Sequence, residues 1–115
     1  MIVCKFGGTS VASAAQITKV ANIVKSDEKR RIVVVSAPGK RSSEDIKVTD
    51  LLIDLADAAL ANADVESKIE TVVNRYKDIT AELGLGQDIC DVIAADLRER
   101  VAGDRSNTEL FIDSL

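Results

Sequence analysis

A lysine, two glycines and two hydroxyl side chains stand close together near the start of the chain. Lys5 brings a positive charge. Gly7 and Gly8 carry no side chain, so their backbone N–H groups can come close to a ligand. Thr9 and Ser10 add hydroxyl donors, and a helix that follows them would turn its positive end to the same place. Together these groups predict an anion site suited to phosphate, although a tight turn alone would also explain both glycines.

The residue types exclude several other chemistries. The chain has no histidine, which rules out Ser-His-Asp triads, Cys-His dyads and His-based zinc sites. The glycines also depart from two common nucleotide motifs. The lysine of a Walker A loop follows its glycines, whereas Lys5 precedes Gly7, and GxGxxG is absent. We identify no metal-ligating residues, and any reaction here must proceed without imidazole.

Two short apolar runs must position these groups. Ile2–Phe6 is mostly apolar and ends at the glycines, and Ile32–Val35 is entirely β-branched and ends at Ser36. Such an unbroken run is typical of a strand covered on both faces. Between the runs, Ser13–Gln16 matches a capping box and precedes an apolar helix face. That face comprises Ile17, Val20, Ala21 and Val24. Strand, helix and strand form a βαβ unit, which implies a parallel sheet.

A second loop is expected beside the first. Ligands of open α/β sheets bind beyond the carboxyl ends of the parallel strands, so the loop after Val35 should lie next to the Lys5–Ser10 segment. Ser36 and Gly39 are possible additional donors in that loop.

Other polar residues of the second loop have simpler explanations. Lys40 and Arg41 are best explained as solvated loop charges. Thr49 and Asp50 open the next helix, where helix capping and ligand contact are equally good explanations.

Beyond Lys47 the pattern is helical to the last residue. Three apolar helix faces are expected, and the second and third helices should end near Gly84–Gly86 and Gly103. Their residues are Leu52, Leu55, Ala56 and Ala59; then Ile69, Val72, Val73 and Tyr76; then Ile89, Val92, Ile93 and Leu97. A fourth helix should start at Ser106–Glu109.

Composition limits the class of protein. A chain of 115 residues that is 46% hydrophobic and 30% charged is typical of one globular domain. A net charge of -4 and an aromatic content of 3% argue against nucleic-acid binding. No apolar run approaches the about 20 residues of a membrane span, and no signal peptide is evident. Cys4 and Cys90 are far apart and outside any CxxC motif, which favours a cytoplasmic protein.

Three segments resemble one enzyme family. Lys5–Val11 (KFGGTSV) resembles the signature of aspartokinases, on the same first strand. Val33–Ala37 (VVVSA) and Lys47–Leu52 (KVTDLL) resemble the second strand and the start of the next helix in these enzymes. Other members of the amino-acid kinase superfamily have glycine loops of different sequence at this place. These include the glutamate, acetylglutamate, carbamate and uridylate kinases. The resemblance covers residues 2–55.

The resemblance implies a three-layer αβα fold of the amino-acid kinase (carbamate kinase-like) type, here as its N-terminal portion with an incomplete sheet. It also implies ATP-dependent phosphorylation of the side chain of L-aspartate, with Mg²⁺ bound to the ATP, as the first step of lysine, threonine and methionine synthesis. The partners implied are small molecules and a second copy of the enzyme. A carboxylate is already ionised at neutral pH and needs no general base, so the absence of histidine is no obstacle.

The family's roles can be assigned residue by residue. Lys5 resembles the catalytic lysine at the ATP phosphates and the transition state, and Gly7–Ser10 resembles the phosphate cradle. Ser36 resembles the serine that faces the transferred group, and Thr49 the threonine that helps to hold aspartate. Asp50 stands where the family often has asparagine, so its role stays open.

We expect residues 1–115 to be an N-terminal fragment of the kinase domain, without the rest of that domain and without the regulatory ACT domains. Two parallel strands alone leave unpaired edges and uncovered apolar faces, and the family's Ser-x-Gly-Glu segment is absent. Such a fragment should not turn over. The alternatives are a superfamily member with another acceptor and a non-catalytic, self-associating module.

Overall fold

The computed structural model describes residues 1–115, and the chain forms two compact units, residues 1–49 and 50–115. Length and composition had indicated a single domain. The boundary falls inside helix α2 (Val48–Leu60), not in a loop. No stretch of linker composition therefore marks it in the sequence. No helix combines the length and the apolar character that a membrane span requires.

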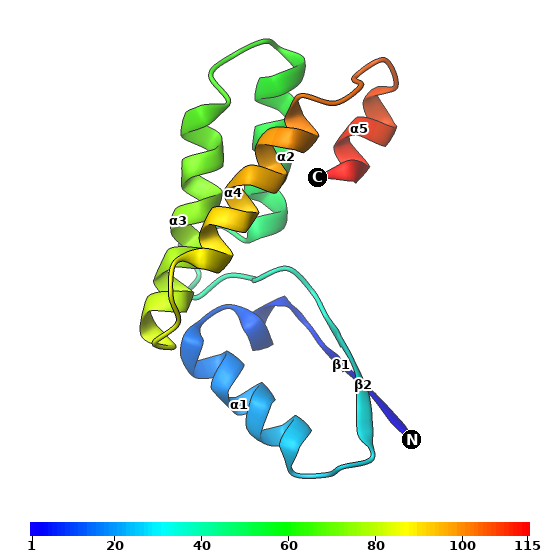
Figure 1. Ribbon diagram of the computed structural model, residues 1–115, viewed down its shortest axis with the longest axis vertical. Coiled ribbons are helices and arrows are strands. Elements are labelled where there is room, and N and C mark those ends of the chain that lie inside the picture. Colours follow the sequence, from blue (N-terminus) through cyan, green and yellow to red (C-terminus); the bar gives the residue numbers. More distant parts are fainter. The chain divides into compact units, whose positions relative to one another are not determined.

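The first unit is the βαβ unit that the sequence predicted. Strands β1 (Ile2–Phe6) and β2 (Arg30–Val35) are parallel neighbours, and Lys5 is paired with Val34. Helix α1 (Ala14–Lys25) connects them and lies against β2 (Figure 1). The predicted cap is confirmed, because Ser13 Oγ accepts a hydrogen bond from Gln16 N at 3.4 Å.

Both strands are more exposed than the sequence predicted. The side chains of the β-branched run are 41–56% exposed, from Val33 at 41% to Val35 at 56%, and Val3 of β1 is 62% exposed. The expectation of strands covered on both faces is therefore wrong for this chain. The physical reason is that α1 is the only α-helix lying wholly within the first unit, and one helix cannot cover both faces of the sheet.

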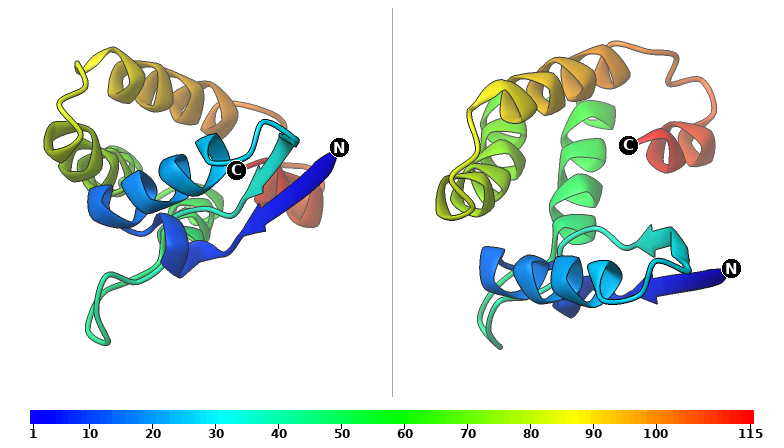
Figure 2. Two further views of the ribbon diagram at one scale, coloured as in Figure 1. Left: turned by 90° about the horizontal axis from the view of Figure 1, so that it is seen from below. Right: turned by 60° about the horizontal axis from the view of Figure 1, so that its bottom comes forward.

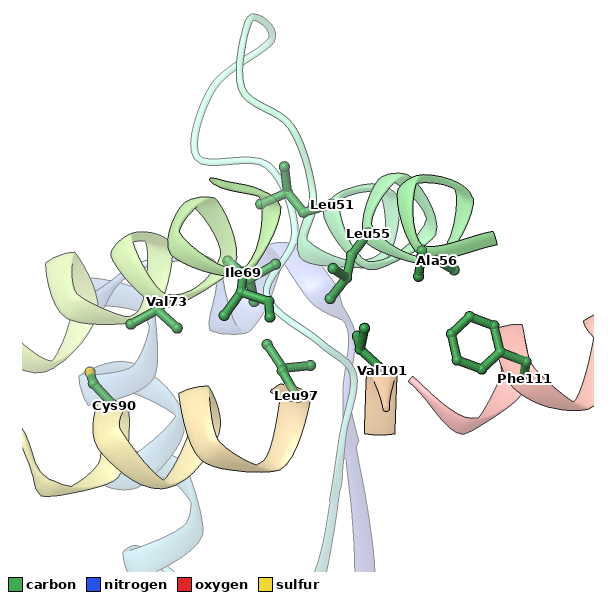
Figure 3. Packing of buried hydrophobic residues seen from close by; sticks show 11 residues of the cluster. Leu51, Leu55, Ala56, Ile69, Val73, Cys90, Leu97, Val101 and Phe111 are labelled. Atoms are coloured by element: carbon green, nitrogen blue, oxygen red, sulfur yellow. The ribbon is translucent and has the colours of Figure 1, made fainter. Parts of the chain in front are cut away.

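The second unit is helical and has its own core. After α2 it contains α3 (Glu66–Glu82), α4 (Asp88–Val101) and α5 (Thr108–Ser114). These four helices confirm the helical segments that the periodicity predicted. Gly84 follows Leu83, the C-cap of α3, and has a φ of 74°, a left-handed conformation that glycine adopts without strain. The side chains of the core point toward one another in Figure 3 and include Leu51, Leu55, Ile69, Val73, Cys90, Leu97, Val101 and Phe111.

The buried face of α4 differs from the predicted one. Ile89 and Val92 were expected to point inward, but they are 51% and 67% exposed. The predicted Leu97 is buried, but Cys90 takes the place of Ile89 and Val92 in the core, and its Sγ lies 3.5 Å from Thr80 Oγ1 of α3. A shift of one position turns a helical side chain by about 100°, so the residue next to a predicted core position can take its place.

Candidate functional site

Backbone hydrogen bonds join the two loops at the carboxyl ends of the strands. Ser36 N donates to Phe6 O at 3.1 Å and continues the pairing of the strands. Farther along, Gly39 N donates to Gly8 O at 2.8 Å. The prediction that the two loops lie side by side is therefore confirmed.

Gly8 and Gly39 are required by the close contact between these loops. A Cβ atom on Gly39 would lie 2.7 Å from the carbonyl carbon of Gly8 and 2.9 Å from Thr9 N. A Cβ atom on Gly8 would lie 3.2 Å from both the Ala37 carbonyl oxygen and the Gly39 Cα. All of these neighbours are backbone atoms, which cannot rotate away as a side chain can. Packing within the chain therefore explains these two glycines.

Gly7 has no such explanation. A Cβ atom at this position would have no heavy atom within 4 Å. Its φ of -74° and ψ of 175° are extended values that any residue adopts. Neither the backbone conformation nor the neighbouring atoms require a glycine. The space beside the backbone at this position is open. This space leaves room for a ligand at Gly7.

A short turn separates the glycines from α1. Residues Gly8–Val11 form a 3-10 helix, labelled η1, in which Ser10 N donates to Gly7 O at 3.1 Å. Helix α1 begins only at Ala14, and Ser13 caps its first amides. The helix therefore starts at the predicted cap, with a separate turn between it and the glycines. The sequence did not predict this turn, because its four residues are too few to show a helical period.

The remaining predicted site residues also belong to the first unit, whereas Asp50 is the first residue of the second. Lys5, Thr9 and Ser36 have exposed side chains, and Ser10 is half-buried. Thr49 is exposed in the first turn of α2, directly after Val48, whose N–H donates to Pro38 O at 2.9 Å. This hydrogen bond ties the start of α2 to the loop that contacts Gly8. Asp50 lies in the first turn of α2, where a carboxylate is favoured by the helix dipole.

An ion pair within the second loop was missed in the sequence. Arg41 Nε donates to Asp45 Oδ2 at 2.7 Å, and Arg41 Nη2 donates to Asp45 Oδ1 at 3.2 Å. Hydrogen bonds from the Arg41 side chain and from its backbone N–H hold the pKa of the Asp45 carboxyl far below its ordinary value of 3.8. Arg41 is thus part of the loop structure, although 41% of its side chain is still exposed to solvent. Opposite charges four residues apart are a recognisable signal on a helix, but here they lie in a loop.

The second unit contributes none of the predicted site residues. A hollow of about 510 Å³ lies between α4 and α5 and is lined by residues such as Asp96, Arg100 and Phe111. Arg100 is already paired with Asp96 at 2.8 Å. No group of three acidic or cysteine side chains in the chain is arranged to hold a metal ion.

Comparisons with known proteins agree on one family. The model of the amino acid kinase family matches residues 1–104. The chain is 51% identical to aspartokinase 3 of Bacillus subtilis over 115 residues, which are 100% of this chain and 25% of that protein. The crystal structure of Clostridium acetobutylicum aspartate kinase matches 94% of this chain and 25% of its own, with a TM-score of 0.83 and 32% identity.

A second solved structure is that of E. coli aspartokinase III in complex with aspartate and ADP. It matches 99% of this chain and 26% of its own, with a TM-score of 0.68 and 26% identity. These matches confirm the predicted α/β class and the likeness to the N-terminal part of the aspartokinase fold. The chain spans about a quarter of the length of these relatives.

Proposed function

Because the chain belongs to the amino acid kinase family, we propose that it is the N-terminal part of the kinase domain of an aspartate kinase. The proposed reaction transfers the terminal phosphoryl group of ATP to the side-chain carboxylate of L-aspartate and gives 4-phospho-L-aspartate. This product enters lysine, threonine and methionine synthesis. The rest of the kinase domain and the regulatory ACT domains would lie outside residues 1–115.

The observation that carries this proposal is the open space at Gly7. A phosphate group that approaches the backbone of residues 7–9 needs this space, and no contact within the chain uses it. Two flanking groups suit the same ligand, namely the positive charge of Lys5 and the hydroxyl of Thr9. The complex of E. coli aspartokinase III with aspartate and ADP supports the same pair of ligands here.

Phosphoryl transfer to aspartate requires that the two substrates are positioned and that their negative charges are neutralised. The aspartate carboxylate is the nucleophile and is ionised without help from a base. Its attack places two anions side by side, and negative charge spreads over the transferred oxygens in the transition state. In our proposal Lys5 neutralises part of that charge, Gly7–Ser10 hold the phosphates, and Ser36 faces the transferred group. Thr49 holds aspartate.

Mg²⁺ would arrive as part of the substrate, bound to ATP. Phosphate oxygens are good ligands for this ion. We further propose that the whole enzyme is a cytoplasmic homo-oligomer that acts on small molecules and binds neither nucleic acid nor membranes. The net charge of -4 supports the exclusion of nucleic acid.

A chimera tests the proposed function. Residues 1–115 would replace the matching quarter of Bacillus subtilis aspartokinase 3, and ATP-dependent phosphorylation of aspartate would be measured. We expect an active enzyme. Lys5→Met should lower kcat/KM for aspartate phosphorylation by about 10²–10³, as expected for the loss of one transition-state donor.

Lys29→Met is the matched control. Lys29 is exposed, and its carbonyl accepts from Ile2 N at 2.7 Å, so it stands at the amino ends of both strands, opposite the glycines. The control variant should keep full activity. A folded chimera that phosphorylates another acceptor in place of aspartate would favour a different member of the superfamily. An active chimera that tolerates Lys5→Met would refute the role of Lys5.

A further inference from the structure

Residues 39–47 form a loop whose two ends are held together. Val48 N donates to Pro38 O at 2.9 Å and closes the base of this 39–47 loop. Figure 2 shows it as a narrow teal loop with its two arms side by side. Closed surface loops of this length are compact structures that frequently carry function.

The loop is also ordered from within. Asp45 accepts from the side chain and from the backbone N–H of Arg41, the latter at 2.9 Å. Asp45 Oδ1 accepts from Ile46 N at 3.0 Å, and Asp45 N donates to Ser42 O at 3.2 Å. The loop therefore has a defined shape without any ligand. A group carried by such a loop loses little conformational entropy when a ligand binds.

The two adjacent cations of the loop differ in their surroundings. Arg41 is paired with Asp45, and only 15% of the Asp45 side chain is exposed. Lys40 is exposed and has no ion-pair partner in the chain. The loop structure therefore explains Arg41 but gives no role to Lys40.

Lys40 lies next to the phosphate cradle. It follows Gly39, whose backbone N–H donates to Gly8 O. The two glycines are so close that a Cβ atom added to Gly8 would lie 3.2 Å from the Gly39 Cα. Consecutive Cα atoms are about 3.8 Å apart, and lysine carries its ammonium group on a flexible four-carbon stem. The ammonium group of Lys40 can therefore reach the open space beside Gly7–Thr9.

We propose that Lys40 is a second cationic ligand of the nucleotide phosphates, presented by the 39–47 loop and acting together with Lys5. This inference rests on the proposed function and deepens it. Phosphate is favoured over the aspartate carboxylate, because Gly39 packs on Gly8 and Thr9, which are cradle residues. A nucleotide polyphosphate carries several negative charges, and Lys5 is the only other cation of the proposed cradle. Asp45 is a positioning residue that fixes the loop and not a ligand.

The test measures the binding of ADP to the chimera described above, by calorimetry at about 0.1 M salt. Lys40→Ala should raise the Kd for ADP about tenfold, as expected for one exposed charge-assisted hydrogen bond. Lys40→Arg should restore most of the affinity. Lys29→Ala removes the same charge at the opposite end of the strands and should leave the Kd unchanged.

Kinetics separate the two anionic substrates. Lys40→Ala should raise KM for ATP and leave KM for aspartate within twofold. An increase confined to KM for aspartate would overturn the phosphate assignment. Equal ADP affinities of the Lys40→Ala and Lys29→Ala variants would overturn the proposal altogether. ADP binding is measured without turnover, so a chimera that binds ADP but does not phosphorylate aspartate refutes the proposed function while still testing Lys40.

Asp45→Asn provides a second, independent variant. Freeing the loop should weaken ADP binding by about threefold while Lys40 is present, and have no further effect in the Lys40→Ala background. Equal effects of Asp45→Asn in both backgrounds would overturn the claim that the loop acts through Lys40.

Discussion

The three glycines of the loop contact should respond very differently to the same substitution. Alanine at position 39 would bring its Cβ atom to 2.7 Å from the Gly8 carbonyl carbon and 2.9 Å from Thr9 N, so the two loops must separate. Overpacking of this kind costs about 1–3 kcal/mol. Alanine at position 8 meets its nearest backbone atoms at 3.2 Å and should cost less, about 1 kcal/mol.

Alanine at position 7 should behave in the opposite way. Its Cβ atom would meet nothing within 4 Å, and the backbone angles suit any residue. Replacing glycine under these conditions reduces the freedom of the unfolded chain and stabilises by about 0.4–1 kcal/mol. The same Cβ atom would occupy the space that we assign to a phosphate. Gly7→Ala should therefore raise stability and weaken ADP binding in the chimera.

Urea unfolding followed by circular dichroism measures the stability of the three variants. The midpoint should be highest for Gly7→Ala, lower for Gly8→Ala and lowest for Gly39→Ala, with similar slopes. A Gly39→Ala variant as stable as the parent would contradict the close contact between the loops. If Gly7→Ala either destabilised the chain like Gly39→Ala or kept full ADP affinity, the ligand explanation of Gly7 would be refuted.

Three further predictions concern charged and ionisable groups. The Arg105 guanidinium donates to the carbonyl of Ala59 in α2 at 2.6 Å and to that of Val101 in α4 at 2.8 Å. Arg105→Met should therefore lower the free energy of unfolding in urea by about 1.5–3 kcal/mol. A decrease near zero would show that these hydrogen bonds do not stabilise the second unit. Burial raises the pKa of Tyr76, the one tyrosine in a chain without tryptophan, so absorbance at 295 nm should titrate above pH 10 and return to the ordinary value in urea. Because the folded pKa is the higher one, stability should fall as the pH rises beyond about 10, and Tyr76→Phe should remove this fall. Arg41 lowers the pKa of Asp45, so the carboxylate stays ionised and paired at pH 7 and at pH 5. Asp45→Asn should therefore cost the same free energy of unfolding at both pH values, and the cost should shrink only below the ordinary pKa of 3.8. A cost that vanished by pH 5 would contradict the pairing.

Local patterns were sufficient for most of the secondary structure. The capping box at Ser13, the β-branched run before Ser36 and the helical periods after Lys47 each depend on neighbours within a few residues, and all correspond to observed elements. The parallel pairing followed as well, because a strand, a helix and a strand connect in one favoured way. The misplaced face of α4 shows the limit of this approach. Ile89 and Cys90 are both apolar, but only Cys90 is buried, beside Thr80 of α3.

By itself the sequence determined which residues make up the site, namely a glycine loop with a lysine before it and hydroxyl side chains after it. It also determined the family that has this motif. The tertiary structure decided what each residue is for. Gly7 and Gly8 are the same residue type in the sequence. In the structure Gly7 faces open space, whereas Gly8 packs against the backbone of Gly39. Arg41 pairs with Asp45, whereas its neighbour Lys40 makes no ion pair. These distinctions depend on contacts between segments distant in the chain and on the path of an irregular loop, which no local period encodes.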